Sequence, residues 1–395
     1  MSETSVRDPV AGRIVELVTD RRDAIVGLLT DLADIESPSL VPETQLPVQD
    51  LVRRSLEACG FEAARLPGEK TGGHIQLWPG GHEDGGAPIQ VLLGHTDTVW
   101  PLGTIQEMPV EVDEARGVVR GPGVFDMKGG IVQIVFALRA LNDLGLQPTV
   151  TPVVFLNSDE EIGSPESYPH IERLAKRARR VLVMEPALGP EGRIKTTRRG
   201  VGQFEIRVVG KASHSGLAPQ EGASAIQEMA HVIRLLHGLT DVDKGIGVNV
   251  GTVSGGTRAN VVAAECRAQV DVRVTTLADA RSIEAAIRGL SPTTPGTRLE
   301  VEGAVARAPM EATPRNRALW KAVHECGARM GVELAQGLSG GGSDGNITSL
   351  YTATVDGMGA VGDGAHARHE YVDIEKLLER TALLALTLMV PDLDG

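Results

Sequence analysis

The sequence is short of cysteine and of aromatic residues. Its three cysteines, Cys59, Cys266 and Cys326, lie far apart and have no C-x-x-C spacing, which argues against a disulfide framework and against a zinc knuckle. Aromatic residues make up only 3% of the chain, whereas glycine is abundant at 47 residues. We therefore expect reduced, buried thiols in a globular protein with many tight loops.

Positive charge is also scarce. The 39 lysines and arginines are outnumbered by 52 aspartates and glutamates, which gives a formal net charge of −13. This balance argues against nucleic acid or an anionic membrane as a partner. No apolar stretch approaches the length of a membrane span, and residues 1–18 lack the basic and apolar segments of a secretion signal. We expect a cytoplasmic protein.

The length of 395 residues exceeds one typical core, so two domains are expected. Apolar positions recur at helical spacing over residues 13–35. Apolar runs at 89–93, 150–156 and 181–184 are short enough to be buried parallel strands, and a helical pattern at 129–144 separates the first two. This alternation predicts an α/β domain with a mostly parallel sheet flanked by helices, whose ligands bind at the carboxyl ends of the strands.

The pattern changes near residue 195. Residues 199–209 alternate between apolar and polar side chains, as in an antiparallel strand with one wet face. The elements that follow have the order βαββαβ. We therefore expect an inserted α+β sandwich at residues 195–305, which interrupts a first domain made of residues 1–194 and 306–395.

Potential metal-binding side chains stand where apolar runs end or where Gly-rich loops turn. They form a set of two histidines and three carboxylates: His95, Asp126, Glu161, Glu185 and His366. Such a set is suited to two divalent metal ions around an activated water, which indicates a metallohydrolase. Each residue has a plainer alternative as a strand-end cap, a helix N-cap or part of a solvated acidic loop. Their joint placement favours the metal site.

The acidic neighbours of these residues have separate expected roles. Asp97 follows His95 by two residues, so both point to one face of the strand, and Asp97 is expected to orient the imidazole. Three consecutive acids at 159–161 would repel one another without a cation. We assign Glu161 as a ligand and Glu160 as the base that takes a proton from the water.

Taken together, these segments closely resemble the dinuclear zinc M20 metallopeptidases. This group holds glutamate carboxypeptidase, aminoacylase-1, acetylornithine deacetylase and succinyl-diaminopimelate desuccinylase. The matching segments are G-H-T-D-T-V, G-P-G-V-F-D-M-K-G-G, D-E-E-I-G-S, M-E-P, K-A-S-H-S-G and a late A-H. The resemblance implies a zinc-exopeptidase-like catalytic domain with an inserted lid and dimerisation domain, and hence a homodimer.

The resemblance also implies which residues hold two Zn²⁺ ions per chain. It assigns His95, Asp126 and Glu185 to one zinc and Asp126, Glu161 and His366 to the other, with Glu160 as the base. Co²⁺ or Mn²⁺ would suit the same ligands. His366 rests on the shortest match, and His369 is its rival.

Substrate-binding residues are expected in the insert and in a late Gly-rich loop. The resemblance makes His214 a stabiliser of the oxyanion and Asn260 a substrate contact, although a surface-turn role is the alternative for His214. Arg273 could grip a substrate carboxylate, or form a surface salt bridge. Gly341 lies in the loop 337–345, which resembles the segment lining the substrate pocket, unless that loop is merely flexible.

Our first hypothesis is a zinc exopeptidase that releases a C-terminal amino acid, with glutamate expected, from a peptide or N-acyl amino acid. Glu185 and the triple glycine look most like the glutamate carboxypeptidase branch. The alternative is an N-acyl-amino-acid deacylase of the aminoacylase or deacetylase type. A non-catalytic peptide- or metabolite-binding member is disfavoured because Glu160 and all five ligands are present. The negative charge disfavours a two-metal phosphatase or nuclease.

Overall fold

The computed structural model describes residues 8–81 and 87–393. The chain forms two compact units. The large unit comprises Met1–Thr196, Ala312–Leu338 and Ser343–Gly395, and the small unit comprises Thr197–Glu311 and Ser339–Gly342. None of the described helices has the length and hydropathy that crossing a membrane requires.

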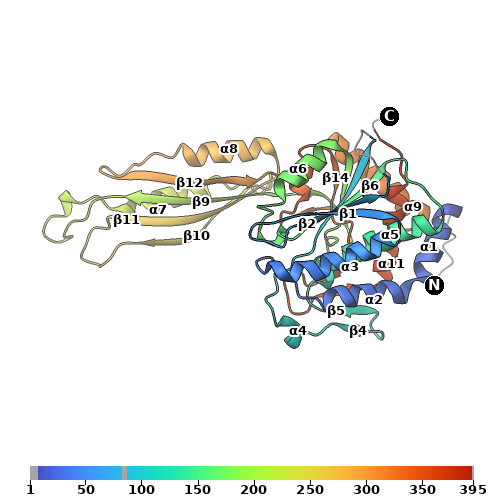
Figure 1. Ribbon diagram of the computed structural model, residues 1–395. Helices are drawn as coiled ribbons and strands as arrows, with labels where there is room; N and C mark the ends of the chain where they lie inside the picture. Colours follow the sequence, from blue (N-terminus) through green and yellow to red (C-terminus); the bar gives the residue numbers. More distant parts are fainter. Residues whose placement is uncertain (1–7, 82–86, 394–395) are drawn as a thin grey trace. The chain divides into compact units, whose positions relative to one another are not determined.

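The large unit is built on a six-stranded sheet with the order β1-β2-β6-β3-β7-β14. Figure 1 labels β1, β2, β6 and β14 of this sheet. Its strands are β1 (Phe61–Leu66), β2 (His74–Pro79), β3 (Ile89–His95), β6 (Thr151–Asn157), β7 (Ala178–Val183) and β14 (Ala353–Val355). The last four are parallel to one another, whereas β2 pairs antiparallel with both of its neighbours, β1 and β6. The expected mostly parallel sheet is confirmed.

Helices cover both faces of this sheet because its central strands are apolar on both sides. Leu92 and Leu182 point into one core and Val91 and Val181 into another. The first core is closed by α1 (Pro9–Asp20), α2 (Arg22–Ala33), α3 (Gln45–Glu57), α5 (Gly129–Asp143), α9 (Pro314–Met330) and α11 (Ile374–Leu388), and the second by α6 (Tyr168–Arg177) and α10 (Gly345–Thr348). The carboxyl ends of the strands are left to carry polar side chains.

Three strands deliver acidic or imidazole side chains to the same edge. β3 ends at His95, which lies opposite Asn157 at the end of β6, and Met184 and Glu185 follow β7 directly. Gly130 and Gly359 let two further segments approach the Met184 carbonyl oxygen, because a Cβ at either position would lie 2.1 Å from that atom. The backbone around Glu185 is therefore held from two sides.

A small antiparallel sheet with the order β15-β16-β5-β4 joins segments far apart in the sequence. β5 leads into the Gly-rich loop before Asp126, and β16 follows the loop with His366, so pairing of β5 with β16 brings these loops together. The remaining elements outside the small unit are η1 (Pro42–Thr44), α4 (Thr104–Glu107), β4 (Glu111–Asp113), β5 (Val118–Arg120), η2 (Val124–Lys128), η3 (Glu160–Ile162), β15 (Gly362–Asp363) and β16 (Tyr371–Asp373). β8 (Ile194–Arg198) and β13 (Gln336–Ser339) pair with each other in a separate two-stranded sheet.

The small unit has the expected βαββαβ order (Figure 1). Its elements are β9 (Gly200–Val209), η4 (Pro219–Glu221), α7 (Ala225–His237), β10 (Gly247–Gly255), β11 (Glu265–Val274), α8 (Leu277–Arg288) and β12 (Arg298–Arg307). The antiparallel sheet has the order β10-β11-β9-β12. Ile206 and Val270 on one face of the sheet share a core with Met229 of α7 and Ile283 of α8. This two-layer arrangement confirms the expected α+β sandwich.

Candidate metal centre and active site

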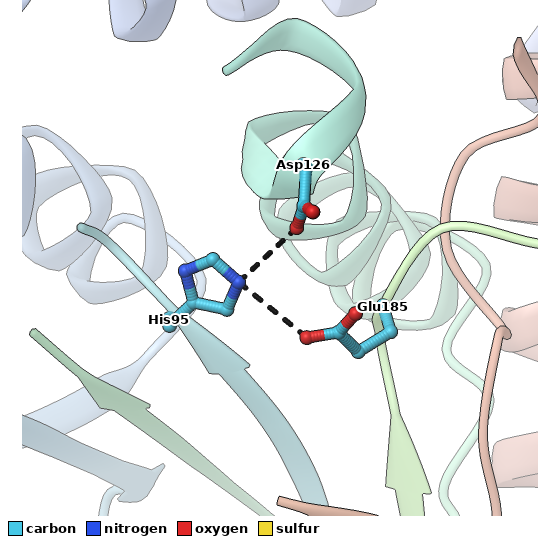
Figure 2. A group of neighbouring side chains, drawn as sticks. All are labelled: His95, Asp126 and Glu185. Atoms are coloured by element: carbon cyan, nitrogen blue, oxygen red, sulfur yellow. Dashed lines mark ion pairs between the residues drawn. The ribbon is translucent and has the colours of Figure 1, made fainter. Parts of the chain in front are cut away.

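The first group of candidate ligands consists of His95, Asp126 and Glu185. His95 Nε2 lies 3.3 Å from Asp126 Oδ1 and 3.4 Å from Glu185 Oε1 (Figure 2). The three side chains come from the end of β3, the Gly-rich loop before α5 and the segment after β7. One ligand atom from each lies within 4.8 Å of the other two, which is close enough for all three to contact one ion.

The second group consists of Asp126, Glu161 and His366. His366 Nε2 lies 3.4 Å from Asp126 Oδ2 and 3.1 Å from Glu161 Oε2. Asp126 therefore belongs to both groups, with Oδ1 directed at His95 and Oδ2 at His366. His369 belongs to neither group. The structure thus brings together all five residues of the predicted set.

Unsatisfied polar atoms show that these residues fit metal ions. His95 Nε2, Asp126 Oδ1 and Glu161 Oε1 are buried and have no hydrogen-bond partner among the described residues. Such atoms cost free energy unless a ligand satisfies them. One imidazole nitrogen and carboxylate oxygens in each group are donors that Zn²⁺, Co²⁺ and Mn²⁺ accept.

The charges of the two ligand groups also favour cations. Asp126 and Glu161 raise the pKa of His366 to about 10. Burial opposes protonation of His95, yet Asp126, Asp97 and Glu185 raise its pKa well above the ordinary value of 6.5. Burial raises the pKa of Glu161. The carboxylates thus attract positive charge, which divalent ions can supply in place of protons.

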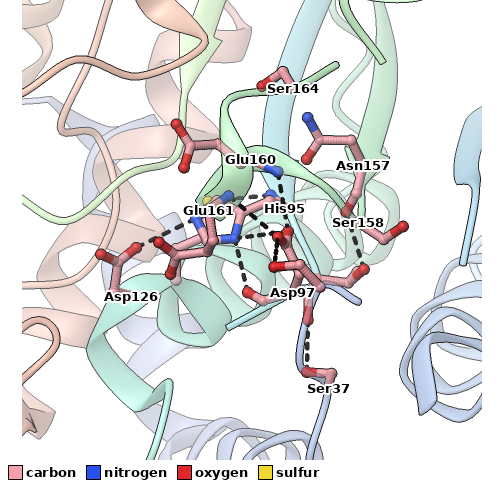
Figure 3. A network of polar contacts seen from close by, with 12 residues as sticks. Ser37, His95, Asp97, Asp126, Asn157, Ser158, Glu160, Glu161 and Ser164 are labelled. Carbon is pink, nitrogen blue, oxygen red and sulfur yellow. Dashed lines mark hydrogen bonds and ion pairs between the residues drawn. The ribbon is translucent and has the colours of Figure 1, made fainter. Parts of the chain in front are cut away.

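Asp97 contacts both His95 and the acidic segment after β6. His95 Nδ1 lies 2.9 Å from the Asp97 backbone oxygen and 3.4 Å from Asp97 Oδ1, so this contact holds the proton on Nδ1 and leaves Nε2 free for a metal (Figure 3). Oδ2 accepts hydrogen bonds from Ser39 Oγ at 2.7 Å and Glu161 N at 3.1 Å, and Oδ1 accepts one from Glu160 N at 3.3 Å. Asp97 therefore orients one candidate ligand and fixes the backbone of another.

Glu160 and Glu161 diverge although they are neighbours. The short helix η3 that begins at Glu160 turns successive side chains in different directions. Figure 3 draws the Glu161 carboxylate beside Asp126 and the Glu160 carboxylate apart from it. Glu160 is half-buried, whereas the Asp97 side chain beside it is fully buried. This divergence places the Glu160 carboxylate outside both ligand groups.

Comparison with known proteins identifies the family. The family model described as peptidase family M20/M25/M40 matches residues 91–390. The chain belongs to this family. It is therefore a metal-dependent amide hydrolase, as the resemblance of its motifs implies.

Individual relatives cover most of the chain. Carboxypeptidase G2 of Pseudomonas sp. (strain RS-16) is 28% identical over 389 residues, which are 95% of this chain and 91% of that protein. Acetylornithine deacetylase of Myxococcus xanthus is 31% identical over 273 residues, 65% of this chain and 68% of the relative. The crystal structure of aminopeptidase PepT from Bacillus cereus ATCC 10987 has a TM-score of 0.76 at 19% identity and covers 93% of this chain and 98% of that one. This last similarity shows the fold.

In this M20 peptidase the small unit carries two of the predicted substrate residues side by side. His214 pairs with Val261 in a β-bridge, and Ser215 N donates to the Asn260 backbone oxygen at 3.1 Å. His214 Nδ1 accepts hydrogen bonds from the backbone N–H groups of Gly216 and Leu217, each at 3.1 Å. The neutral imidazole therefore carries its proton on Nε2, where it can donate to an oxyanion.

The other two predicted substrate residues are held by neighbours. Arg273 Nε and Nη2 each lie 3.0 Å from the Asp271 carboxylate, which is the surface ion pair considered above as the alternative. The Gly341 backbone oxygen accepts a hydrogen bond from Arg198 Nη1 at 3.2 Å. Arg198 itself is buried, so it fixes the triple-glycine loop from inside the small unit.

The sequence interpretation missed a buried glutamate beside the centre. Glu370 is 1% exposed and accepts hydrogen bonds from the loop that carries Asp126. Burial raises its pKa to about 7, although these hydrogen bonds oppose the shift. Its position four residues after His366 was the one available signal, and nothing in the local pattern distinguishes it from a surface acid.

Proposed function

We propose that this M20-family enzyme is a two-zinc carboxypeptidase that releases a C-terminal amino acid, glutamate first, from a peptide or an N-acyl amino acid. The observation that carries the proposal is the pair of ligand groups sharing Asp126 at the carboxyl ends of the strands. Similarity to carboxypeptidase G2 along 95% of the chain supports the carboxypeptidase branch.

The proposed ligand sets follow the two groups. His95, Asp126 and Glu185 would hold one metal ion, and Asp126, Glu161 and His366 the other. When bound, the two ions would lower the pKa of a water molecule and polarise the scissile carbonyl. Asp97 would keep Nε2 of His95 in the tautomer that binds metal.

The chain's own residues would supply the proton transfers and the positioning. Glu160 would accept the proton of the attacking water and return it to the leaving amine. His214 would donate from Nε2 to the tetrahedral oxyanion, and Asn260 would contact the substrate. Arg273 would bind the substrate carboxylate only by exchanging its present partner Asp271, and Gly341 would offer a backbone amide.

We further propose that residues 1–194 and 306–395 form the catalytic domain and that residues 195–305 serve as lid and dimerisation domain. In the small unit β10 is an edge strand, and exposed apolar side chains lie on it and on α7, namely Val253 (56% exposed), Ile226 (48%) and Leu235 (50%). Unpaired strand edges with exposed apolar side chains favour self-association. A homodimer is expected, and a monomer at micromolar concentration in analytical ultracentrifugation would refute it.

We also propose that the enzyme is located in the cytoplasm. The described cysteines are all free thiols, and two of them, Cys266 and Cys326, are buried. Reduced thiols are typical of a reducing compartment. Secretion of the active enzyme in cell fractionation would contradict this part.

The second candidate is an N-acyl-amino-acid deacylase. Similarity to an acetylornithine deacetylase at 31% identity supports it, and the same centre would cleave either amide. A non-catalytic binding protein is disfavoured by the presence of Glu160 and of both complete ligand groups.

The deciding experiment combines metal analysis with a substrate panel. The purified protein is assayed for bound metal and for hydrolysis of N-acyl-glutamate, N-acyl-alanine and N-acetylornithine, with and without chelator, and Glu160→Gln serves as the inactive control. Two metal ions per chain and the highest kcat/KM for the glutamate substrate would support the carboxypeptidase. Preference for acetylornithine or alanine would favour the deacylase, and failure to bind metal after supplementation would refute the centre.

A further inference from the structure

Glu370 is a buried carboxylate that contacts the centre without belonging to either ligand group. Its oxygens accept four hydrogen bonds: from Gly123 N at 3.0 Å, Phe125 N at 2.9 Å, Asp126 N at 3.1 Å and Trp100 Nε1 at 3.0 Å. No lysine or arginine of the described residues forms an ion pair with it. The buried Lys128 interacts with it electrostatically without forming an ion pair. Its four hydrogen-bond partners are N–H donors, and three of these belong to one loop.

This loop needs an external support. Gly121 and Gly123 have positive φ values of 150° and 74°, and Asp126 has a non-helical backbone inside η2. A loop with this conformation does not satisfy its N–H groups by regular helical hydrogen bonds. Glu370 accepts three of them, and thereby holds the backbone N–H of Asp126 itself.

Glu370 also belongs to the segment that presents His366. Ala367 N donates to Gly364 O at 2.8 Å, and Glu370 N donates to Ala367 O at 3.0 Å, so residues 364–370 form two consecutive tight turns. His366 has a positive φ of 60° within them. Through these turns and its carboxylate, Glu370 connects the backbone of His366 to the backbone of Asp126.

We propose that Glu370 is a positioning residue for the two-metal centre. It fixes the loop 121–126 so that Asp126 can present one oxygen to each ligand group, and it keeps His366 at the matching distance. The inference depends on the proposed two-metal site, because only a shared Asp126 requires such control. Glu370 itself would contact neither ion.

The test is Co²⁺ titration of the metal-free full-length protein, followed by visible absorption. In Glu370→Gln an NH₂ group replaces one acceptor oxygen and faces N–H donors, so the loop loses about half of its support. We expect two cobalt ions to bind still, with affinity for at least one lowered about 10- to 100-fold and with altered absorption bands, because such supporting residues affect metal affinity by that factor.

Glu166→Gln provides the matched control. Glu166 also supports a loop of the large unit, accepting hydrogen bonds from Glu69 N, Lys70 N and Thr71 Oγ1, but it contacts no candidate ligand. Its variant should keep the wild-type cobalt affinity and spectrum. An equal loss of affinity in both variants would mean general loosening and would overturn the proposal, as would wild-type binding by Glu370→Gln.

Two further outcomes separate the proposal from its premise. If the wild-type protein binds fewer than two cobalt ions, the result refutes the proposed two-metal site, on which the role of Glu370 depends. It is thereby distinguished from a failure of Glu370 to support the loop, which only a difference between the variant and the wild type can reveal. If Glu370→Gln does not fold, Trp100→Phe decides, because it removes one of the four donors and leaves the carboxylate. Weaker cobalt binding by folded Trp100→Phe would then support the proposal, and unchanged binding would overturn it.

Discussion

Replacing Asp97 with asparagine should weaken metal binding without unfolding the protein. The carboxylate accepts hydrogen bonds from Ser39 Oγ, Glu160 N and Glu161 N and lies beside His95 Nδ1. Asparagine has the same shape but only one acceptor oxygen. Its NH₂ group must therefore oppose at least one N–H donor wherever it is placed.

The magnitude follows from the less costly placement. An NH₂ group at the position of Oδ1 opposes both Glu160 N and the proton on His95 Nδ1. At the position of Oδ2 it opposes Glu161 N alone, because the Ser39 hydroxyl can turn and accept a hydrogen bond. Losing one hydrogen bond to a charged acceptor costs about 1.5–3 kcal/mol. At about 1.4 kcal/mol for each factor of ten, this corresponds to roughly 10- to 150-fold weaker binding if the loss falls on the ligands. Measured effects of such supporting groups are about 10- to 100-fold.

The assay is equilibrium competition for Zn²⁺ with a chromogenic chelator, performed on wild-type protein, Asp97→Asn and Ser39→Ala. The last variant removes one donor and leaves the carboxylate, so its affinity should fall less. Circular dichroism establishes that each variant is folded. Unchanged zinc affinity in folded Asp97→Asn would refute the reasoning, because the carboxylate would then neither orient His95 nor hold the acidic segment.

Three further predictions concern other parts of the molecule. Glu160→Gln should retain its metal ions but lose about 10²- to 10⁴-fold in kcat, the usual contribution of a general base, as measured by turnover and metal analysis; near wild-type turnover would exclude it as the base. Chelation should lower Tm in thermal denaturation, since metal ions that bind only the folded state stabilise it, and re-added zinc should restore it; a Tm insensitive to chelator would contradict the buried site. The Arg329 guanidinium beside Asp8, together with the N-cap hydrogen bonds, lowers the pKa of that carboxyl below 3.8. A carboxyl whose pKa is lowered by folding stabilises the folded state at pH values above the pKa of the unfolded chain. Asp8→Asn should therefore be less stable than wild type near pH 7 in urea unfolding, and the difference should shrink below pH 3.8. A stability difference independent of pH would count against the ion pair.

The central sheet could be predicted because burial on both faces leaves a plain signal. β3, β6 and β7 contain uninterrupted apolar runs at residues 91–93, 153–156 and 181–183. The helix α5, which lies between β3 and β6 in the chain, is apolar nearly all round. The strand β1 could not be predicted from the sequence, because Phe61–Leu66 is a half-exposed edge strand that carries a glutamate and an arginine. The helical pattern at 13–35 is divided by Arg21, whose ψ of 10° ends α1 before α2 begins.

The ligands differ in how far the sequence alone could place them. The neighbouring parallel strands β3, β6 and β7 carry His95, Glu161 and Glu185 at or just after their carboxyl ends. Because parallel strands end at the same edge of a sheet, these three side chains are expected to lie close together. His366 depends on the pairing of β5 with β16, three-residue strands that carry no periodic signal. Its assignment over His369 came from the family motif, and the structure brings His366, not His369, into the group with Glu161.

The buried acids around the centre divide into two kinds, and the division explains why the site selects cations. Asp97 and Glu370 accept hydrogen bonds mainly from backbone N–H groups, which stabilise a carboxylate without adding a net positive charge. Asp126 and Glu161, in contrast, form ion pairs only with histidine among the described residues. A lysine or arginine at this point would compete with a metal ion for the same oxygens. The fold therefore stabilises the supporting acids with backbone hydrogen bonds and leaves the charge of the coordinating acids for metal ions.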